Sequence, residues 1–357
     1  MKALVIGGTG PTGPFIVDGL LARGYQVTIY HRGTHEIEFS GPVEHIHGDP
    51  FSRDDLERDL APRRWDLVIS NYGRLRYIAH VLAGRTPRFI GITSPGGYLG
   101  FRDAAHNPDG LAVPIHEDAT LIEDRNIDNF GFLIADTERQ LMAAHQRGDY
   151  QVTVLRYPRV YGPRQLIPDM WPIVKRAIDR RPHIVVPGAG LRIRAMGYAE
   201  NMAHTVLLAV DKPQASGQIY NVADEHYLTL KGRADLIARF VGHEWAVVEA
   251  QHPWAEALAF SYAGPEYHTM LDISKIKGEL GYRDEVAAEE GVRRTVAWLV
   301  ENHATVITER AAKVLGDSYD YDLEDRFINA YREHMDALSA AFPTPPPPPI
   351  YEYLYRE

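Results

Sequence analysis

The feature that most constrains the fold is a glycine-rich turn within the first thirteen residues. Residues 2–6 form a short apolar run, typical of a strand buried on both faces of a parallel sheet. Gly7, Gly10 and Gly13 follow, and residues 14–23 have the spacing of an amphipathic helix. In such a strand–turn–helix unit, backbone N–H groups and the helix dipole attract anions, and glycines let a pyrophosphate approach closely. The pattern predicts a dinucleotide site, and the alternative is a tight turn without a ligand.

Composition limits the class of protein. The chain has 357 residues, enough for two lobes, and 45% of them are hydrophobic. A formal net charge of −10 disfavours a nucleic-acid or anionic-membrane surface. The absence of cysteine excludes disulfides, thiolate metal sites and a cysteine nucleophile. A strand that begins at residue 2 and the lack of a long apolar run favour a cytoplasmic protein.

Short apolar segments alternate with amphipathic segments over the first half of the chain, as in a parallel sheet with helices on both faces. After the first strand, further strands are predicted at residues 26–30, 43–47, 65–70, 88–93 and 151–155. We therefore predict an α/β protein with a doubly wound parallel sheet, the NAD(P)-binding Rossmann fold.

Beyond residue 165 the alternation loosens, and the pieces are expected to form a smaller α/β substrate lobe over the sheet edge. Helices are predicted at residues 171–180, 198–210, 230–241 and 287–301, and short strands at residues 183–187 and 220–223. The predicted division is a Rossmann domain over 1–165, with 198–225 returning to it, and a substrate lobe formed by 166–197 and 226–302.

Residues 303–357 are predicted to be a C-terminal helical and Pro-rich extension. A helix is expected at residues 325–341, and residues 343–349, with six prolines, are expected to be extended polyproline II. The extension could pack on a neighbouring subunit in a homodimer, cover its own substrate lobe, or form a disordered tail. These alternatives stay open at the level of the sequence.

The end of the second strand indicates which dinucleotide is bound. An acidic residue at this place would bind the 2′-hydroxyl of NAD, whereas arginine suits a 2′-phosphate. The strand ends in His31 and Arg32 without an acidic residue, so NADP is favoured over NAD. Asp49, after the third strand, is predicted to lie near the adenine, or else to cap the following helix.

The fourth and fifth strands also end in small or polar residues. Asn71 and Tyr72 follow the fourth strand, and Ser94 and Tyr98 follow the fifth. In an open parallel sheet the carboxyl ends of the strands form the ligand-binding edge. These side chains are therefore predicted to lie near the cofactor or the substrate.

Six short motifs have the order and composition of one known family. They are residues 7–13 (GGTGPTG), 93–98, 155–164 (LRYPRVYGPR), 217–222 (GQIYNV), 272–281 and 290–298. With them, residues 1–302 resemble the extended short-chain dehydrogenase/reductase family, the NAD(P)-dependent sugar epimerases and dehydratases. The resemblance implies an oxidoreductase, isomerase or lyase. Cofactor contacts are predicted at Gly7, Thr9, Gly10, Pro11, Thr12, Gly13, His31, Arg32, Asp49, Asn71, Tyr72 and Pro158.

The chain departs from the family at its acid/base pair. The family has a tyrosine and, four residues later, a lysine on the long helix before the sixth strand, and this pair exchanges protons with a carbonyl or alcohol. Phe130 and Ile134 stand at these places, and neither side chain has a proton to exchange. Ser94 matches the family residue that hydrogen-bonds the reacting oxygen, or it is only a strand-end cap. Tyr98 is predicted to substitute as the acid/base, although it could be a core tyrosine.

The substrate lobe gives a further indication. Arg194 matches the family position that binds the diphosphate of a nucleotide sugar, and Arg159 is a second predicted substrate contact. A second arginine usual in nucleotide-sugar members is absent, and the lobe is rich in aromatic residues, either as core or around an aromatic substrate. The aromatic residues are Trp171, Trp245, Trp254, Phe260, Tyr262 and Tyr267.

We therefore predict an NADP-binding enzyme that acts on a small, possibly aromatic, carbonyl or alcohol substrate with non-standard acid/base residues. The alternative is a catalytically reduced dinucleotide-binding sensor or regulatory protein. Neither nucleic acid nor membrane is an expected partner. No metal is expected either, because His31, His35, His45 and His47 are scattered over two strands and a loop without ligand spacing.

Overall fold

The computed structural model describes the chain apart from Tyr72, Pro108, residues 252–253, 255–257 and 259–266, Ser318 and residues 343–357. Its centre is a seven-stranded sheet in the order β10-β6-β5-β4-β1-β2-β3, and every neighbouring pair is parallel. The strands are β1 (Lys2–Ile6), β2 (Gln26–His31), β3 (Val43–His47), β4 (Leu67–Ser70), β5 (Arg88–Thr93), β6 (Gln151–Arg156) and β10 (Gln218–Asn221). The predicted doubly wound parallel sheet is confirmed.

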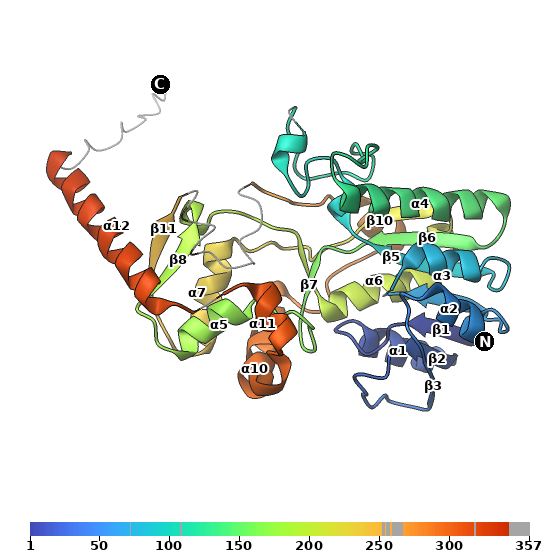
Figure 1. Cartoon of the computed structure of the whole chain (residues 1–357). Helices are drawn as coiled ribbons and strands as arrows, with labels where there is room; N and C mark the ends of the chain where they lie inside the picture. Colours follow the sequence, from blue (N-terminus) through green and yellow to red (C-terminus); the bar gives the residue numbers. More distant parts are fainter. Residues whose placement is uncertain are drawn as a thin grey trace, which may run out of the picture.

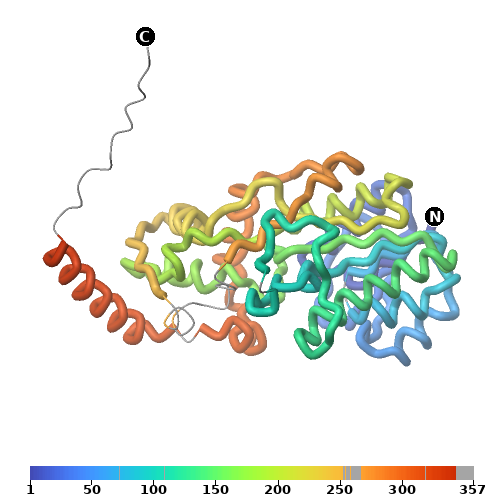
Figure 2. Tube along the Cα trace, turned by 90° about the horizontal axis from the view of Figure 1, so that it is seen from above, coloured from blue at the N-terminus to red at the C-terminus, as the bar shows by residue number. Residues whose placement is uncertain are grey.

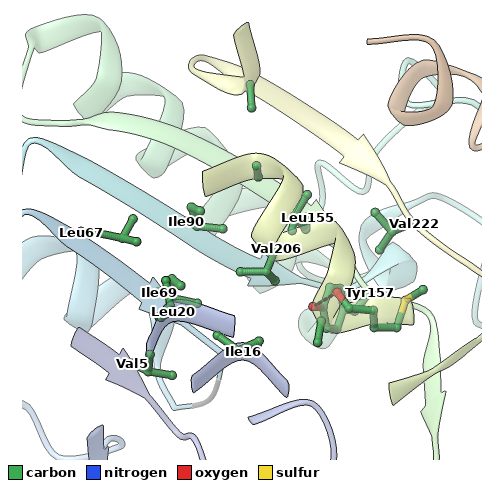
Figure 3. Packing of buried hydrophobic residues seen from close by; sticks show 14 of the residues in the cluster. Val5, Ile16, Leu20, Leu67, Ile69, Ile90, Leu155, Tyr157, Val206 and Val222 are labelled. Atoms are coloured by element: carbon green, nitrogen blue, oxygen red, sulfur yellow. Dashed lines mark hydrogen bonds between the residues drawn. The ribbon is translucent and has the colours of Figure 1, made fainter. Parts of the chain in front are cut away.

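Helices cover both faces of this sheet because successive strand residues point to opposite sides. Val5 of β1 packs under α1 and α6, whereas Leu4 packs on the other side of the sheet. Figure 3 shows the first of these cores, where Ile16 of α1 and Val206 of α6 meet the sheet. The first face carries α1 (Gly13–Ala22), α6 (Ala199–Asp211) and α9 (Ser274–Leu280), and the second carries α2 (Arg53–Leu60), α3 (Leu75–Val81) and α4 (Asn129–Arg147).

A smaller lobe lies beyond one edge of the strands (Figure 1). Its core gathers side chains from three helices and from a two-stranded parallel sheet. These elements are α5 (Trp171–Ile178), α7 (Leu230–Phe240), α10 (Ala288–Val306), β8 (His183–Pro187) and β11 (Ala246–Ala250). A parallel pair, β7 (Arg159–Tyr161) and β9 (Met196–Tyr198), lies between the lobes. The short 3₁₀ segments are Pro95–Gly97, Ala104–His106, Gly188–Gly190 and Pro213–Ala215.

The C-terminal extension packs on the smaller lobe of its own chain. It forms α11 (Glu309–Leu315) and α12 (Tyr321–Ala341), so the helix predicted from residue 325 begins four residues earlier. Arg176 of α5 is buried and bonds to both Asp317 and Glu324. Figure 2 shows α12 along the outside of the lobe, with its second half leading away from the body. The predicted polyproline segment lies outside the described residues.

None of the helices that the structure describes is both long enough and apolar enough to cross a membrane.

Candidate dinucleotide and substrate site

The glycine turn between β1 and α1 adopts a backbone that side chains would disrupt. Gly7 and Gly8 have positive φ angles of 106° and 97°, a region that favours glycine. A Cβ on Gly13 would lie 2.2 Å from the carbonyl carbon and oxygen of Gly8, so the turn closes on the start of the helix. Gly10 has open space where a Cβ would lie. The first turn of α1 contains no acidic residue, which keeps its N-terminus attractive to an anion.

A cavity of about 230 Å³ opens above this turn, at the carboxyl edge of the sheet. Of the predicted cofactor residues, eight line it: Gly7, Thr9, Gly10, Pro11, Thr12, His31, Arg32 and Asn71. The prediction missed other lining residues, which are Gly8, Thr34, His35, Ile92, Tyr157, Val160 and Leu166. The last three come from the chain between the lobes, so only tertiary structure brings them to the turn. The open backbone, the helix N-terminus and the cationic rim fit a dinucleotide pyrophosphate and its ribose.

Asn71 ties the fourth strand to the glycine turn. Its side-chain Nδ2 donates to Thr12 Oγ1 over 2.7 Å, and its backbone N–H donates to the Ile6 carbonyl over 3.0 Å. The end of β4 is thereby fixed beside the N-terminus of α1. A ligand that enters the cavity therefore meets a pre-ordered wall.

A second cavity, of about 630 Å³, adjoins the first. Asn71 and Ile92 line both cavities, so the two lie side by side along the sheet edge. The second is mainly apolar, with a few hydroxyl groups and two arginines. Its remaining lining residues are Phe51, Ser70, Gly73, Arg74, Leu75, Arg76, Thr93, Ser94, Phe130, Leu133, Ile134 and Thr137.

Helix α4 presents an apolar face to this second cavity. Phe130 and Ile134 both line it, and α4 contains neither tyrosine nor lysine. Asp128 caps the helix by accepting the N–H groups of Phe130 at 2.9 Å and Gly131 at 3.1 Å. Arg102 bonds to Asp128, and its guanidinium lies 4.7 Å from the centre of the Phe130 ring. The phenylalanine is therefore held in place at the cavity, and neither Phe130 nor Ile134 offers a group for proton exchange there.

Ser94 forms the predicted strand-end cap and also lines a cavity. Its Oγ accepts the Gly96 N–H over 3.1 Å and so caps the 3₁₀ turn that follows β5. The same side chain lines the second cavity. Because the oxygen accepts the amide, the hydroxyl hydrogen is left to donate toward the cavity.

Tyr98 does not face the nicotinamide end, and the prediction that it substitutes as acid/base is wrong in this structure. The side chain is fully buried, and its hydroxyl donates to Asn221 Oδ1 over 2.8 Å. Arg156 donates to the same hydroxyl and stacks on the ring. Burial raises the pKa of Tyr98 to about 12, against the opposing effect of Arg156. Tyr98 is therefore a core residue, and neither cavity includes it among its lining side chains.

The residue behind Tyr98 belongs to a buried ion pair that the sequence did not reveal. Arg156, at the end of β6, and Glu138, on α4, are both 2% exposed, and the closest N–O distance is 2.7 Å. Thr93 also donates its hydroxyl to Glu138, over 2.7 Å. Burial lowers the pKa of Arg156, but Glu138 raises it more, so the guanidinium stays charged. This pair fixes α4 against the end of the strands.

The four remaining cofactor predictions have different outcomes. Asp49 does not line the dinucleotide cavity, and its carboxylate accepts the Phe51 N–H over 3.0 Å in the turn before α2; its contact with the adenine stays a prediction. The cap of α2 itself is Ser52. Pro158 is not a lining residue, although Tyr157 is. Tyr72 lies outside the described residues, and Gly13 acts through its close packing rather than by lining the cavity.

The predicted substrate arginines lie apart from both sheet-edge cavities. Arg159 pairs with buried Asp169 over 2.8 Å. Arg194 lines a hollow of only about 20 Å³, room for about one water molecule. Burial, together with the charge of Arg159, lowers the pKa of Arg194 to about 10. A diphosphate therefore has no cavity at Arg194 in this structure.

The aromatic residues of the smaller lobe mostly fill its core. Trp171 is buried and stacks on His303, and Trp245 packs against the same core. Trp254 is 60% exposed, and the Tyr267 hydroxyl donates to the Gly100 carbonyl. The structure does not describe Phe260 or Tyr262. The aromatic side chains that do meet a sheet-edge cavity, Phe51, Phe130 and Tyr157, come from other parts of the chain.

A hollow of about 680 Å³ lies at the opposite edge of the sheet. Its lining includes Lys2 and Gln26, the first residues of β1 and β2, and Trp65 before β4. Parallel sheets bind ligands at the carboxyl ends of their strands, so we place the functional site at the glycine turn.

The histidines are not scattered, and in this respect the prediction is wrong. His31, His45 and His47 come together with Glu36, and one ligand atom from each lies within 4.8 Å of all the others. Sequence spacing did not reveal this group because the pairing of β2 with β3 creates it.

Comparison with known proteins shows what the chain is similar to. Residues 113–223 match the model of the "NAD dependent epimerase/dehydratase family". The chain is 26% identical over 312 residues to the "Chloroplast stem-loop binding protein of 41 kDa b, chloroplastic" of Arabidopsis thaliana, covering 82% of this chain and 77% of that protein. It is 24% identical over 331 residues to a dTDP-glucose 4,6-dehydratase of Streptomyces niveus, covering 85% and 94%.

A solved structure has the same fold. It is the UDP-glucose 4-epimerase from Bifidobacterium longum in complex with NAD+ and UDP, with a TM-score of 0.66 and 18% identity, covering 85% of this chain and 99% of that one. The chain thus resembles the extended short-chain dehydrogenases/reductases: residues 113–223 match their epimerase/dehydratase family model, and the whole fold matches that of an epimerase.

Proposed function

We propose that the protein is an NADP-dependent enzyme that transfers hydride between the nicotinamide and a small, mainly apolar carbonyl or alcohol substrate. The observation that carries the proposal is that two cavities lie side by side at the carboxyl edge of the sheet and share Asn71 and Ile92 as lining residues. The first has the glycine turn of a dinucleotide site, and the second has room for a substrate beside it. The epimerase and dehydratase relatives support an enzyme of this kind.

The preference for NADP rests on the rim at the end of β2. His31, Arg32 and His35 line the first cavity, and the residues that the structure places around this cavity include no aspartate or glutamate. A 2′-phosphate would find cationic and hydrogen-bonding partners there, whereas the 2′-hydroxyl of NAD would lack its usual carboxylate. When bound, NADP supplies or accepts the hydride.

The protein's own groups would then act on the reacting oxygen and on the position of the substrate. Ser94 would donate its hydroxyl to the carbonyl oxygen, with the oxygen held by the Gly96 amide. Among the described residues that line the second cavity there is no aspartate, glutamate, histidine, lysine or tyrosine. The proton that balances hydride transfer would therefore be exchanged with water in the cavity. Arg74 and Arg76 would favour a substrate with an anionic group.

One observation favours a second candidate, a dinucleotide-binding protein with reduced catalytic activity. Helix α4 has neither the tyrosine nor the lysine on which the family's proton transfer depends. A relative that aligns with 82% of this chain is named as a stem-loop binding protein. The net charge of −10 weighs against phosphate-backbone binding by this chain.

The test begins with binding and proceeds to turnover. Calorimetric titration with NADP+, NADPH and NAD+ should give tighter binding of the two phosphorylated forms. NADPH oxidation would then be followed with a panel of small carbonyl compounds, with and without a carboxylate. Absence of any dinucleotide binding would refute the proposal, and binding without turnover of any compound would favour the second candidate.

A matched pair of variants tests the role of Ser94. Ser94→Ala should lower kcat by at least about 100-fold, because one donor to a developing oxyanion is lost. Ser339→Ala, at an exposed serine on α12 that lines neither cavity, should leave kcat unchanged. Equal activity of the two variants, with equal thermal midpoints, would remove Ser94 from the mechanism.

A further inference from the structure

Strands β2 and β3 are neighbours in the sheet (Figure 1). His31 ends β2, and β3 carries His45 and His47. The two strands are parallel, and His31 lies opposite His47 in their register. His45 and His47 are two residues apart on β3, so their side chains point to the same face of the sheet. The loop between the strands, residues 32–42, contributes Glu36 above this face. Four ligand-type side chains thus converge from three segments.

Their distances match those between the ligands of a single ion. Glu36 Oε2 lies 3.0 Å from His45 Nδ1, and Glu36 Oε1 lies 3.2 Å from His47 Nε2. His31 Nε2 lies 3.2 Å from His45 Nδ1 and 3.9 Å from Glu36. In a tetrahedral site with bonds of about 2.1 Å, the ligand atoms are about 3.4 Å apart. Small side-chain rotations would bring all four atoms to this arrangement.

We propose that His31, Glu36, His45 and His47 bind a divalent transition-metal ion of the zinc class. Three imidazole nitrogens and one carboxylate oxygen suit Zn²⁺, Co²⁺ or Ni²⁺, whereas Mg²⁺ and Ca²⁺ prefer oxygen ligands only. Four protein ligands fill a tetrahedral coordination sphere, which is the pattern of a structural or regulatory site rather than a catalytic one.

The site is partly buried and can be reached from solvent. The side chain of His31 is 6% exposed and that of His45 is 26% exposed, while those of Glu36 and His47 are both more than half exposed. An ion could therefore enter the folded protein from the Glu36 side. His31 and His45, the less exposed ligands, would give the rigid half of the site, and Glu36 and His47 would close it.

Metal binding would also set the position of the loop beside the dinucleotide cavity, an effect that rests on the function proposed above. Thr34 and His35 of this loop line the cavity, and so does the ligand His31. The Gly33 N–H donates to His31 Nδ1 over 3.3 Å. Coordination through Nε2 places the remaining imidazole proton on Nδ1 and so ends this contact. The ion would hold the loop through Glu36 instead and change the affinity for the dinucleotide.

The first experiment measures metal binding by the full-length protein after treatment with chelator. Titration with Co²⁺ should give the strong visible absorption of a tetrahedral site, saturating at one equivalent, and Zn²⁺ should displace it. Mg²⁺ at the same concentration should not displace the bound Co²⁺. Absence of stoichiometric Co²⁺ and Zn²⁺ binding would overturn the proposal.

Variants assign the ligands. The double variant His45→Ala/His47→Ala and the single variant Glu36→Gln should each weaken Zn²⁺ binding by more than about 100-fold, because loss of an outer-shell partner alone costs about 10–100-fold. His80→Ala, at an exposed histidine on α3, should bind as the unaltered protein does. Circular dichroism in chelator verifies that each variant is folded. Unchanged affinity in folded Glu36→Gln and in the folded double variant would refute the assignment.

The link to the dinucleotide is tested separately. NADP+ affinity should differ at least about threefold between the chelated and the Zn²⁺-loaded protein, and this difference should vanish in Glu36→Gln. If Zn²⁺ binds but NADP+ affinity does not change with it, the coupling is wrong and the metal site stands. If NADP+ does not bind at all, the proposed function fails while the metal titration still decides the site.

Discussion

Removal of the Tyr98 hydroxyl separates a structural from a catalytic role for this residue. In Tyr98→Phe the buried Asn221 Oδ1 loses a donor at 2.8 Å, and Arg156 loses an acceptor. Leaving a buried polar group without its partner costs about 1–3 kcal/mol. The free energy of unfolding should fall by this amount, with a drop of roughly 2–10 °C in the thermal midpoint. Dinucleotide affinity and kcat should change less than about twofold, since the hydroxyl reaches neither cavity.

Urea denaturation and calorimetric titration of the same protein samples measure both quantities. Tyr150→Phe is the matched control because Tyr150 is also buried, packs on Phe89, and has no hydrogen-bond partner for its hydroxyl among the described residues. This control should cost less than about 0.5 kcal/mol. If Tyr98→Phe kept full stability and lost activity by about 100-fold or more, the buried position assigned to Tyr98 would be refuted.

Three further perturbations test other parts of the structure. Gly13→Ala places a Cβ 2.2 Å from the backbone of Gly8, so NADP+ binding in calorimetric titration should be lost, with destabilisation of at least about 1–3 kcal/mol; retained binding would contradict the close packing of the turn. Arg32→Ala should weaken NADP+ binding about 10- to 100-fold and NAD+ binding less than about twofold, and equal losses for both would contradict the 2′-phosphate site. Burial raises the pKa of Asp224 from 3.8 to about 7, so the free energy of unfolding should fall as pH rises between these values, because the unfolded chain releases its proton first; urea titrations at several pH values should show a flatter profile for Asp224→Asn.

The sequence predicted the parts of the fold that local patterns specify. The glycine turn and the predicted strands 2–6, 43–47, 88–93 and 183–187 agree with β1, β3, β5 and β8 residue by residue. Buried parallel strands are short apolar runs between helices, so neighbouring residues suffice to identify them. Among the elements that the sequence did not predict, β7 and β9 have three residues each, too few to show a periodic pattern of apolar residues.

The local sequence also identified most of the residues that line the dinucleotide cavity. The turn residues and the ends of β2 and β4 line it because parallel strands end at one edge of the sheet. Asp49 was predicted as a cofactor contact because it follows the end of β3, but its carboxylate accepts a backbone N–H in the turn before α2. Short-range hydrogen bonds of aspartate compete with ligand binding, and the sequence does not indicate which prevails.

Tertiary structure alone decided that Tyr98 is buried and that the histidines form a cluster. Tyr98 is buried because Arg156 and Asn221, 58 and 123 residues away, meet its hydroxyl. His31 and His47 form one cluster because β2 and β3 pair in a register that places them side by side. The sequence predicted most strands of the central sheet and the glycine turn, since these depend on neighbours along the chain. Which polar side chains reach a cavity, a core or an ion depends on contacts between distant segments, and only the folded chain makes them.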